Sequence, residues 1–244
     1  MTFFDAKAKL LIDVELPDPD PVPASLVNLT GSLDVVLVGW YAVPEQTNPQ
    51  QARDQFEGEA RAALDTIADA FRTAGATVHP HLVFTGNQLD TIERISAEQQ
   101  CDAVLIPHPV NQLERILVPL RGVRNAPRIA RFVADLVQDG TTDVTLLHVL
   151  IEEEEREDVQ HNVLDAVGQM MTEEGLDAGL VRMRIEVADN PGTAIIDAAR
   201  EYDAVVIGET EPSVADVMFG SVPEQIAHEA SIPVMVVRRR DGDA

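Results

Sequence analysis

Short apolar runs alternate along the chain with longer amphipathic stretches. The runs at residues 35–38 and 204–207 are apolar throughout, without the polar–apolar alternation of a strand that has one face in water. This pattern is typical of an α/β protein, in which a parallel sheet is covered by helices on both faces. The pattern predicts strands at 10–16, 34–40, 77–84, 103–107, 116–120, 143–150, 181–187, 204–207 and 234–237, and helices at 50–74, 89–99, 126–138, 157–174, 193–201 and 223–229.

The second half of the chain repeats the first. Residues 101–106 read Cys-Asp-Ala-Val-Leu-Ile and residues 202–207 read Tyr-Asp-Ala-Val-Val-Ile, and each segment follows a predicted helix. The strands that begin at Asp34 and Asp143 match in the same way. Two copies of one βαβαβαβ unit therefore explain the order of elements better than a single large sheet. We expect one domain over 1–112, a second over 113–240, and a tail over 241–244.

The two copies are unequal. After Pro107 the first copy reaches the next strand at once, so it lacks the last helix and strand that the second copy has. The place of its first helix is filled largely by prolines, which have no backbone N–H to donate: Pro17, Pro19, Pro21 and Pro23. The first copy is therefore predicted to be truncated.

Several motifs in the second copy follow one another in a recognisable order. They are residues 115–122 (Arg-Ile-Leu-Val-Pro-Leu-Arg-Gly), 145–149 (Thr-Leu-Leu-His-Val), 190–192 (Asn-Pro-Gly), 203–208 (Asp-Ala-Val-Val-Ile-Gly), Gly220-Ser221, and 232–237 (Ile-Pro-Val-Met-Val-Val). In this order they resemble the universal stress protein family over nearly all of residues 113–238. The first half resembles the family only through its repeat relation to the second.

The resemblance implies tandem parallel-sheet domains of the adenine nucleotide α-hydrolase-like type, usually paired across their edge strand. Some members bind ATP or AMP and others do not. Because the first copy lacks its own edge strand, the strand Val234–Val237 of the second copy is expected to be free. We therefore expect a homo-oligomer, a dimer, formed through this strand.

The predicted nucleotide site departs from the family pattern. Nucleotide-binding members carry Gly-x-x-Gly, nine residues and then Gly-Ser or Gly-Thr after the fourth strand, where backbone N–H groups wrap the phosphates. Here Gly208 and Gly220-Ser221 are present, but Glu211 replaces the second glycine and the spacer has eight residues. Arg121 stands where the family has an acidic residue that contacts the nucleoside. The resemblance thus predicts a degenerate site.

Two interpretations of this segment stay open. In an ATP- or AMP-binding member, Gly208, Gly220, Ser221 and Arg121 would surround the phosphates, and main-chain groups near Val149 would surround the base. Residues 221–224 (Ser-Val-Pro-Glu) also form a capping box, which explains the serine as a helix start without any ligand.

Arginines gather just before and inside the predicted helix at 126–138. Arg124, Arg128 and Arg131 share one helix face, and Arg121 follows a strand end, where open α/β sheets bind ligands. Together with Arg115 they can hold an anion. The alternative is that they form salt bridges with the acidic residues 152–155 or with the carboxylates of a partner.

The chain is strongly acidic. Its 244 residues include 18 Lys and Arg against 42 Asp and Glu, a net charge of −24, which argues against nucleic acid as a partner. Lys7 and Lys9 are the only lysines, and such an acid excess destabilises a compact chain unless salt screens it, so we expect a protein from a salt-rich cytoplasm. The longest apolar runs are too short to span a membrane and the first residues lack a signal-peptide core.

The sequence offers few signals for a disulfide, a metal site or a catalytic nucleophile. The only cysteine, Cys101, excludes a disulfide within the chain, and His79, His81 and His108 lack the spacing of a metal site. No nucleophile motif is present, and slow ATP hydrolysis would depend on acidic residues of the degenerate loop, so a catalytic role is less favoured. The sequence therefore predicts a regulatory or binding protein with no metal, with two alternatives: an ATP- or AMP-binding member, or a soluble partner of a membrane transporter.

Overall fold

The computed structural model describes residues 7–43, 49–123, 125–138, 140–151, 156–209 and 221–239. Apart from a short helix at Ala24–Leu29, which was not predicted, its helices and strands follow the order predicted from the sequence. The first half contains β1 (Lys9–Leu16), α1 (Ala24–Leu29), a 3-10 turn (Thr30–Ser32), β2 (Asp34–Ala42), α2 (Pro49–Thr73), β3 (Thr77–Thr85), α3 (Gln88–Glu98) and β4 (Ala103–Ile106). The second half contains β5 (Arg115–Pro119), α4 (Ala126–Leu136), β6 (Asp143–Leu150), α5 (Arg156–Val159), a π-helical turn (Gln160–Asp165), α6 (Ala166–Glu173), a 3-10 turn (Ala178–Leu180), β7 (Val181–Val187), α7 (Pro191–Ala199), β8 (Ala204–Gly208), α8 (Ser221–Ala230) and β9 (Val234–Val237).

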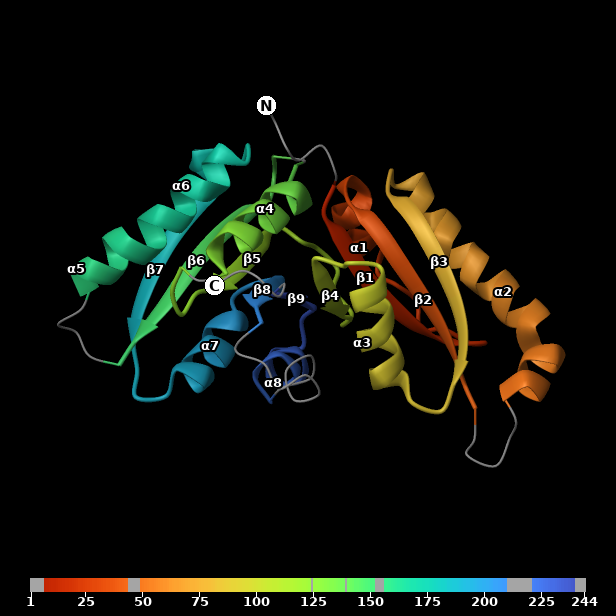
Figure 1. Ribbon diagram of the computed structural model, residues 1–244. Helices are drawn as coiled ribbons and strands as arrows, with labels where there is room; N and C mark the ends of the chain where they lie inside the picture. The colour runs from red at the N-terminus through yellow and green to blue at the C-terminus, as the bar shows by residue number, and fades with distance from the viewer. Residues whose placement is uncertain are drawn as a thin grey trace.

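The nine strands of the described residues belong to one sheet, in the order β3-β2-β1-β4-β9-β8-β5-β6-β7. Neighbouring strands are parallel within each half, and the halves meet where β4 pairs antiparallel with β9. Figure 1 shows this sheet as one twisted surface that runs from β3 on one side of the molecule to β7 on the other. The α/β class is confirmed, but the two copies share a single sheet, contrary to our expectation of separate sheets.

The strand β9 is not a free edge. Val234–Val237 pairs in parallel with β8 on one side and antiparallel with β4 on the other, with Ala103 opposite Val237 and Ile106 opposite Val234. The truncated first half leaves the edge of β4 without a fifth strand of its own, and β9 occupies that position. The predicted dimer through Val234–Val237 is therefore wrong, because both edges of this strand are already paired.

The sequence repeat corresponds to a repeated hydrogen-bond pattern. The carboxylate of Asp102 accepts the backbone N–H of Lys9 at 2.9 Å, and the carboxylate of Asp203 accepts the backbone N–H of Arg115 at 2.9 Å. Each aspartate thus ties the start of the fourth strand of its half to the start of the central strand. This role explains why Asp-Ala-Val recurs at both positions.

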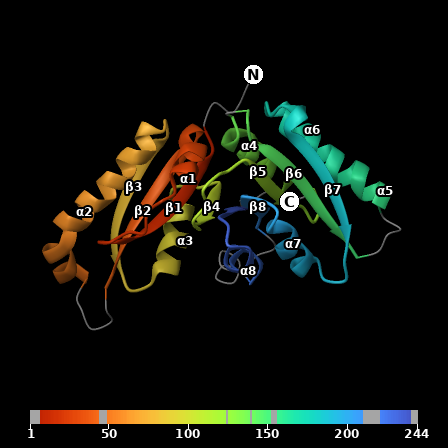
Figure 2. The same ribbon diagram turned by 180° about the vertical axis from the view of Figure 1, so that it is seen from behind.

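The helices form two layers, one on each face of the sheet (Figures 1 and 2). One large apolar cluster lies under α1, α2, α4 and α6, with Phe71 and Phe132 fully buried in it. Smaller clusters lie under α3 and under α7 and α8 on the opposite face. The large cluster includes residues of both halves, so the core is continuous across the β4–β9 junction. No helix in the described ranges is long and apolar enough to cross a membrane.

Candidate functional site

The predicted site lies at the carboxyl ends of β5, β6 and β8. The strand β5 lies between β8 and β6, so the chain leaves the sheet in opposite directions from neighbouring strands there, which is where open α/β sheets bind ligands. Gly208 ends β8, Val149 is the last residue but one of β6, and Arg121 lies two residues after β5. The fold therefore brings Arg121, Val149 and Gly208 together at the carboxyl ends of three neighbouring strands.

Two of the predicted residues are described only in part or not at all. Gly220 lies outside the described residues, as do Glu211 and Asp216 of the same loop. Ser221 is the first residue of α8, and its side chain is not described. Both the predicted phosphate contacts of this segment and its alternative, the capping box, therefore stay predictions.

Gly208 is packed closely against α4. A Cβ atom at this position would lie 2.9 Å from Cδ1 of Ile129 and 3.1 Å from Nδ2 of Asn125. The same Nδ2 donates a hydrogen bond to the carbonyl of Val237 at 3.3 Å, so Asn125 connects α4 to the end of β9. Close helix–strand packing accounts for the glycine without any ligand. Sequence reasoning missed Asn125, because its position depends on the approach of α4.

A carboxylate directly follows β8. The backbone N–H of Glu209 donates to the carbonyl of Val237 at 2.8 Å, and the Glu209 carboxylate accepts the backbone N–H of Arg239 at 2.8 Å. These two hydrogen bonds hold a negative charge at the end of β8. The backbone N–H of Arg239, which follows β9, is therefore already paired within the chain.

Three arginines of the cluster, Arg115, Arg128 and Arg131, form salt bridges. Nη2 of Arg128 lies 3.0 Å from the carboxylate of Asp102, and only 18% and 21% of these two side chains are exposed. Arg115 pairs with Asp203 at 3.6 Å and Arg131 with Asp135 at 4.0 Å. Arg121 is exposed, and Arg124 and residues 152–155 lie outside the described residues. The partners found are thus aspartates at strand starts and on α4, and the salt-bridge interpretation is favoured for Arg115, Arg128 and Arg131.

The predicted histidines are not gathered into a metal site in the described ranges. His79 and His81 lie on β3, where burial, followed by the neighbouring His79, lowers the pKa of His81. Among the described residues, no group of three His, Cys, Asp or Glu side chains is arranged to hold a metal ion.

A partly buried carboxylate in the first half was missed by sequence reasoning. Asp13 lies on the central strand β1, and its carboxylate accepts a hydrogen bond from Nε2 of Gln88 at 2.8 Å. Burial raises the pKa of Asp13, and the hydrogen bond from Gln88 opposes the shift. The signal that could have found it is a charged residue in the middle of an otherwise apolar strand, Leu-Leu-Ile-Asp-Val.

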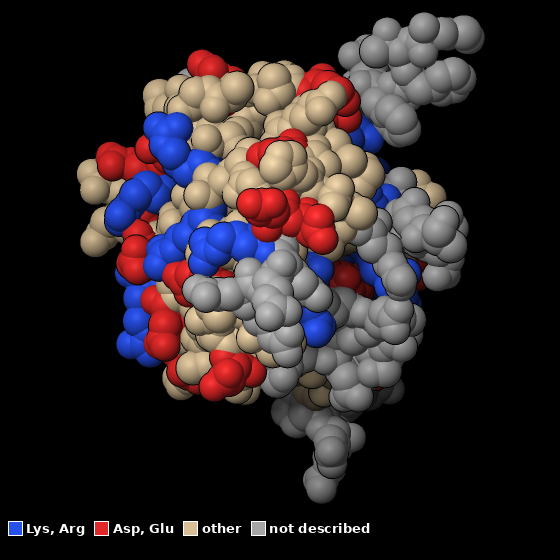
Figure 3. Space-filling view, turned by 90° about the vertical axis from the view of Figure 1, so that its left-hand side faces the viewer, with Lys and Arg blue, Asp and Glu red and all other residues tan. Residues whose placement is uncertain are grey.

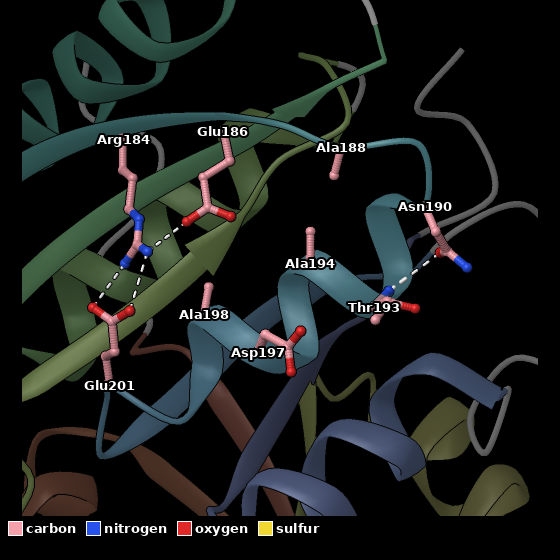
Figure 4. A pocket seen from close by; sticks show the side chains of 9 residues that line it. All are labelled: Arg184, Glu186, Ala188, Asn190, Thr193, Ala194, Asp197, Ala198 and Glu201. Atoms are coloured by element: carbon pink, nitrogen blue, oxygen red, sulfur yellow. Dashed lines mark hydrogen bonds and ion pairs between the residues drawn. The ribbon is translucent and has the colours of Figure 1, made fainter.

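An open pocket of about 390 Å³ lies elsewhere, between β7 and α7 (Figure 4). Arg184 on its wall binds both carboxylate oxygens of Glu201, at 3.0 and 3.1 Å, and also contacts Glu186. The hydrogen bonds that Arg184 donates to Glu201 raise the pKa of Arg184 and lower the pKa of Glu201. Because the one arginine of the pocket is paired twice, it offers no unpaired positive charge to a ligand.

Comparison with known proteins now places the chain in a family. The model of the universal stress protein family matches residues 112–238, which is more than half of the chain, and the chain belongs to this family. A search of curated proteins found no match.

Solved structures share the whole fold. A universal stress protein from Archaeoglobus fulgidus DSM 4304 is 16% identical over 97% of this chain and 98% of its own, with a TM-score of 0.66. A protein of unknown function from Pseudomonas aeruginosa PAO1 is 14% identical over 97% of this chain and 94% of its own, with a TM-score of 0.54. A further universal stress protein from Archaeoglobus fulgidus, in complex with dAMP, is 23% identical over 50% of this chain and 96% of its own, with a TM-score of 0.40. At these identities the first two likenesses show the fold.

Proposed function

We propose that this protein is a regulatory or binding protein of the universal stress type, working in a salt-rich cytoplasm, whose nucleotide site in the second half is degenerate. The observation that carries the proposal is the end of β8. There, the side chains of Asn125 and Ile129 pack directly against Gly208. The carboxylate of the next residue, Glu209, accepts a hydrogen bond from the backbone N–H of Arg239.

The charge at this position opposes a phosphate. A carboxylate about 4 Å from a phosphate oxygen is repelled by about 4 kcal/mol at an effective dielectric constant of about 20. Glu209 is described at this position, and Glu211 adds a further carboxylate in place of the family's second glycine. We infer that the loop after β8 has lost its capacity to wrap phosphates while the fold around it has been kept.

A second candidate function, ATP or AMP binding, is supported by one observation. The Oδ1 atom of Asn125 is buried and no described donor reaches it. A buried acceptor without a partner is costly, and an amino or hydroxyl group of a nucleoside would satisfy it. In this alternative Arg121 neutralises phosphate charge, and the main chain near Val149 contacts the base.

The experiment compares thermal unfolding with and without ATP, AMP and Mg²⁺. It is run in molar KCl, because the acid excess predicts salt-dependent stability. A ligand that binds only the folded state raises the melting temperature. We expect no shift for the natural chain. A shift with ATP that Gly220→Asp abolishes would overturn the proposal in favour of nucleotide binding.

A repaired variant tests the cause. We expect a variant with Glu209→Gln, Glu211→Gly and Arg121→Asp, and with one neutral residue inserted before Gly220, to gain a melting shift with ATP. These changes remove the two carboxylates that directly follow β8 and restore the family pattern. The matched control, Arg200→Asp with Glu173→Gln and Glu174→Gln, leaves the net charge unchanged, as the repaired variant does, on exposed side chains outside this loop. A shift in the control as large as in the repaired variant would show that charge alone is responsible.

A further inference from the structure

The sheet has two outer edges, and only one of them is blocked by proline. With β9 paired on both sides, β3 and β7 are the edge strands. Pro80 in the middle of β3 has no N–H to donate, a common protection of an edge. The seven residues of β7 include no proline, and none of them is fully buried. An additional strand can therefore pair with β7.

Exposed apolar side chains gather at this edge. Five large hydrophobic side chains are exposed in the described part of the chain, and two of them, Met183 and Val187, lie on β7. A third, Ile151, follows β6 beside it, since Leu150 accepts the backbone N–H of Ala188 at 2.9 Å. Figure 3 views the molecule from the side of β7 and shows basic and acidic side chains interleaved around tan surface there.

The hydrogen bond from the backbone N–H of Ala188 to Leu150 shows which main-chain groups of β7 point away from the sheet. Backbone groups of successive residues in a strand point alternately to the two sides. Because the N–H of Ala188 points to β6, those of Arg184 and Glu186 do so as well, and those of Met183, Ile185 and Val187 point away from the sheet. These three residues present a row of backbone donors and acceptors that no other strand of the described ranges pairs with.

Charge selects the partner and its register. In an antiparallel pair of two β7 strands centred on Ile185, Met183 lies opposite Val187 and Arg184 lies opposite Glu186, each twice by symmetry. Such a pairing buries the two exposed apolar side chains against each other and places opposite charges at the closely spaced positions. Centring on Arg184 would oppose two arginines, and centring on Met183 would oppose Arg182 with Arg184.

We propose that β7 pairs antiparallel with β7 of a second copy of this chain, centred on Ile185, to form a symmetric dimer with one continuous sheet. The interface is distinct from the candidate nucleotide site. Arg184 and Glu186, which line the pocket of Figure 4, are then the charged residues that face the second copy. The outward groups of Met183, Ile185 and Val187 supply about six backbone hydrogen bonds across the symmetry axis.

Sedimentation velocity of the full chain in molar KCl tests the dimer. We expect a concentration-dependent monomer–dimer equilibrium. Val187→Pro removes two of the backbone donors without touching the pairing with β6, and we expect it to weaken the dimer by about 30-fold, at about 1 kcal/mol for each hydrogen bond. Val187→Thr, which keeps the N–H and the branched side chain, is the control and stays close to the natural chain. Equal association of the proline and threonine variants, or a natural chain that is monomeric at all concentrations, would overturn the proposal.

A charge exchange tests the register. A chain with Glu186→Arg sets arginine against arginine in its own dimer, and a chain with Arg184→Glu sets glutamate against glutamate. We expect each variant alone to be monomeric and an equal mixture to form a heterodimer, in which every pair is again Arg–Glu. Circular dichroism of each variant controls for folding. Two variants that both dimerise alone, or two folded variants that fail to associate when mixed, would contradict the register.

Discussion

Arg128 joins three segments at the junction of the two halves. From α4 its Nη2 reaches the carboxylate of Asp102 at 3.0 Å, and its Nε donates to the carbonyl of Arg238 after β9 at 2.8 Å. Asp102 immediately precedes β4 and Arg238 immediately follows β9, so the Arg128 side chain connects the two strands that pair at the junction. We predict that Arg128→Met, which keeps the aliphatic stem, lowers the free energy of unfolding markedly.

The magnitude follows from the two contacts. Hydrogen bonds to charged groups contribute about 1.5–3 kcal/mol each. Because about a fifth of each side chain in the Arg128–Asp102 pair is exposed, solvent screens part of this energy. We therefore expect a loss of about 2–3 kcal/mol, since the Asp102 carboxylate keeps the backbone N–H of Lys9 at 2.9 Å.

The assay is urea unfolding in molar KCl, followed by circular dichroism, with Arg94→Met as the matched control. Arg94 pairs with Glu98 at 2.9 Å on the exposed surface of α3, where such a pair is worth only about 0.3–0.5 kcal/mol. Combining Arg128→Met with Asp102→Asn in a double-mutant cycle isolates the ion pair, for which we expect a coupling of about 1–2 kcal/mol. If Arg128→Met costs no more than Arg94→Met, the proposed connection between the halves is refuted.

Two further predictions concern buried titratable groups. Because burial raises the folded-state pKa of Asp13 above its unfolded value, its charged form costs stability as the pH rises through the folded pKa. Asp13→Asn should therefore raise the melting temperature near pH 7, and the difference should vanish towards about pH 3, below the unfolded pKa of about 3.9, where the carboxylate is protonated in both states; a pH-independent difference would contradict this. Burial raises the pKa of the Cys101 thiol to about 11, so we expect no reaction with a disulfide reagent near pH 8 until urea unfolds the chain, and rapid labelling of the folded protein would contradict it.

Much of the fold could be predicted because its elements have strong local signals. The bounds of β7 and β9 agree with the sequence prediction, and Asn190 caps α7 by accepting the backbone N–H of Thr193 at 3.2 Å. The predicted helix over 157–174 is present but interrupted by the π-helical turn Gln160–Asp165. Apolar periodicity does not reveal such an interruption, because the buried side chains Leu164 and Val167 still reach the same core.

The pairing of β9 could not be predicted from its own residues. A continuous apolar run indicates that a strand is covered on both faces but does not say which strand lies beside it. The absence of a fifth strand from the first half was visible in the sequence, and its consequence, a shared β9, requires the halves to be placed together. The same limit explains why Asn125 and the Arg128–Asp102 pair escaped sequence reasoning: both depend on where α4 lies.

For the candidate site, the sequence predicted which strand end each residue lies at, but not the contacts that its side chain makes. Arg121, Val149 and Gly208 lie at one edge because the carboxyl ends of neighbouring parallel strands meet there. The Glu209 carboxylate was visible as a charge, whereas its hydrogen bond to the backbone of Arg239 depends on the chain after β9. The difference matters, because this hydrogen bond holds the negative charge in place at the end of β8.

The central claim is that the end of β8 no longer receives phosphates. Isothermal titration of the natural chain with ATP and Mg²⁺ in molar KCl measures this directly. We expect no heat beyond dilution up to millimolar ATP. Saturable binding of one ATP per chain, lost in Gly220→Asp, would contradict it and would favour the ATP-binding alternative.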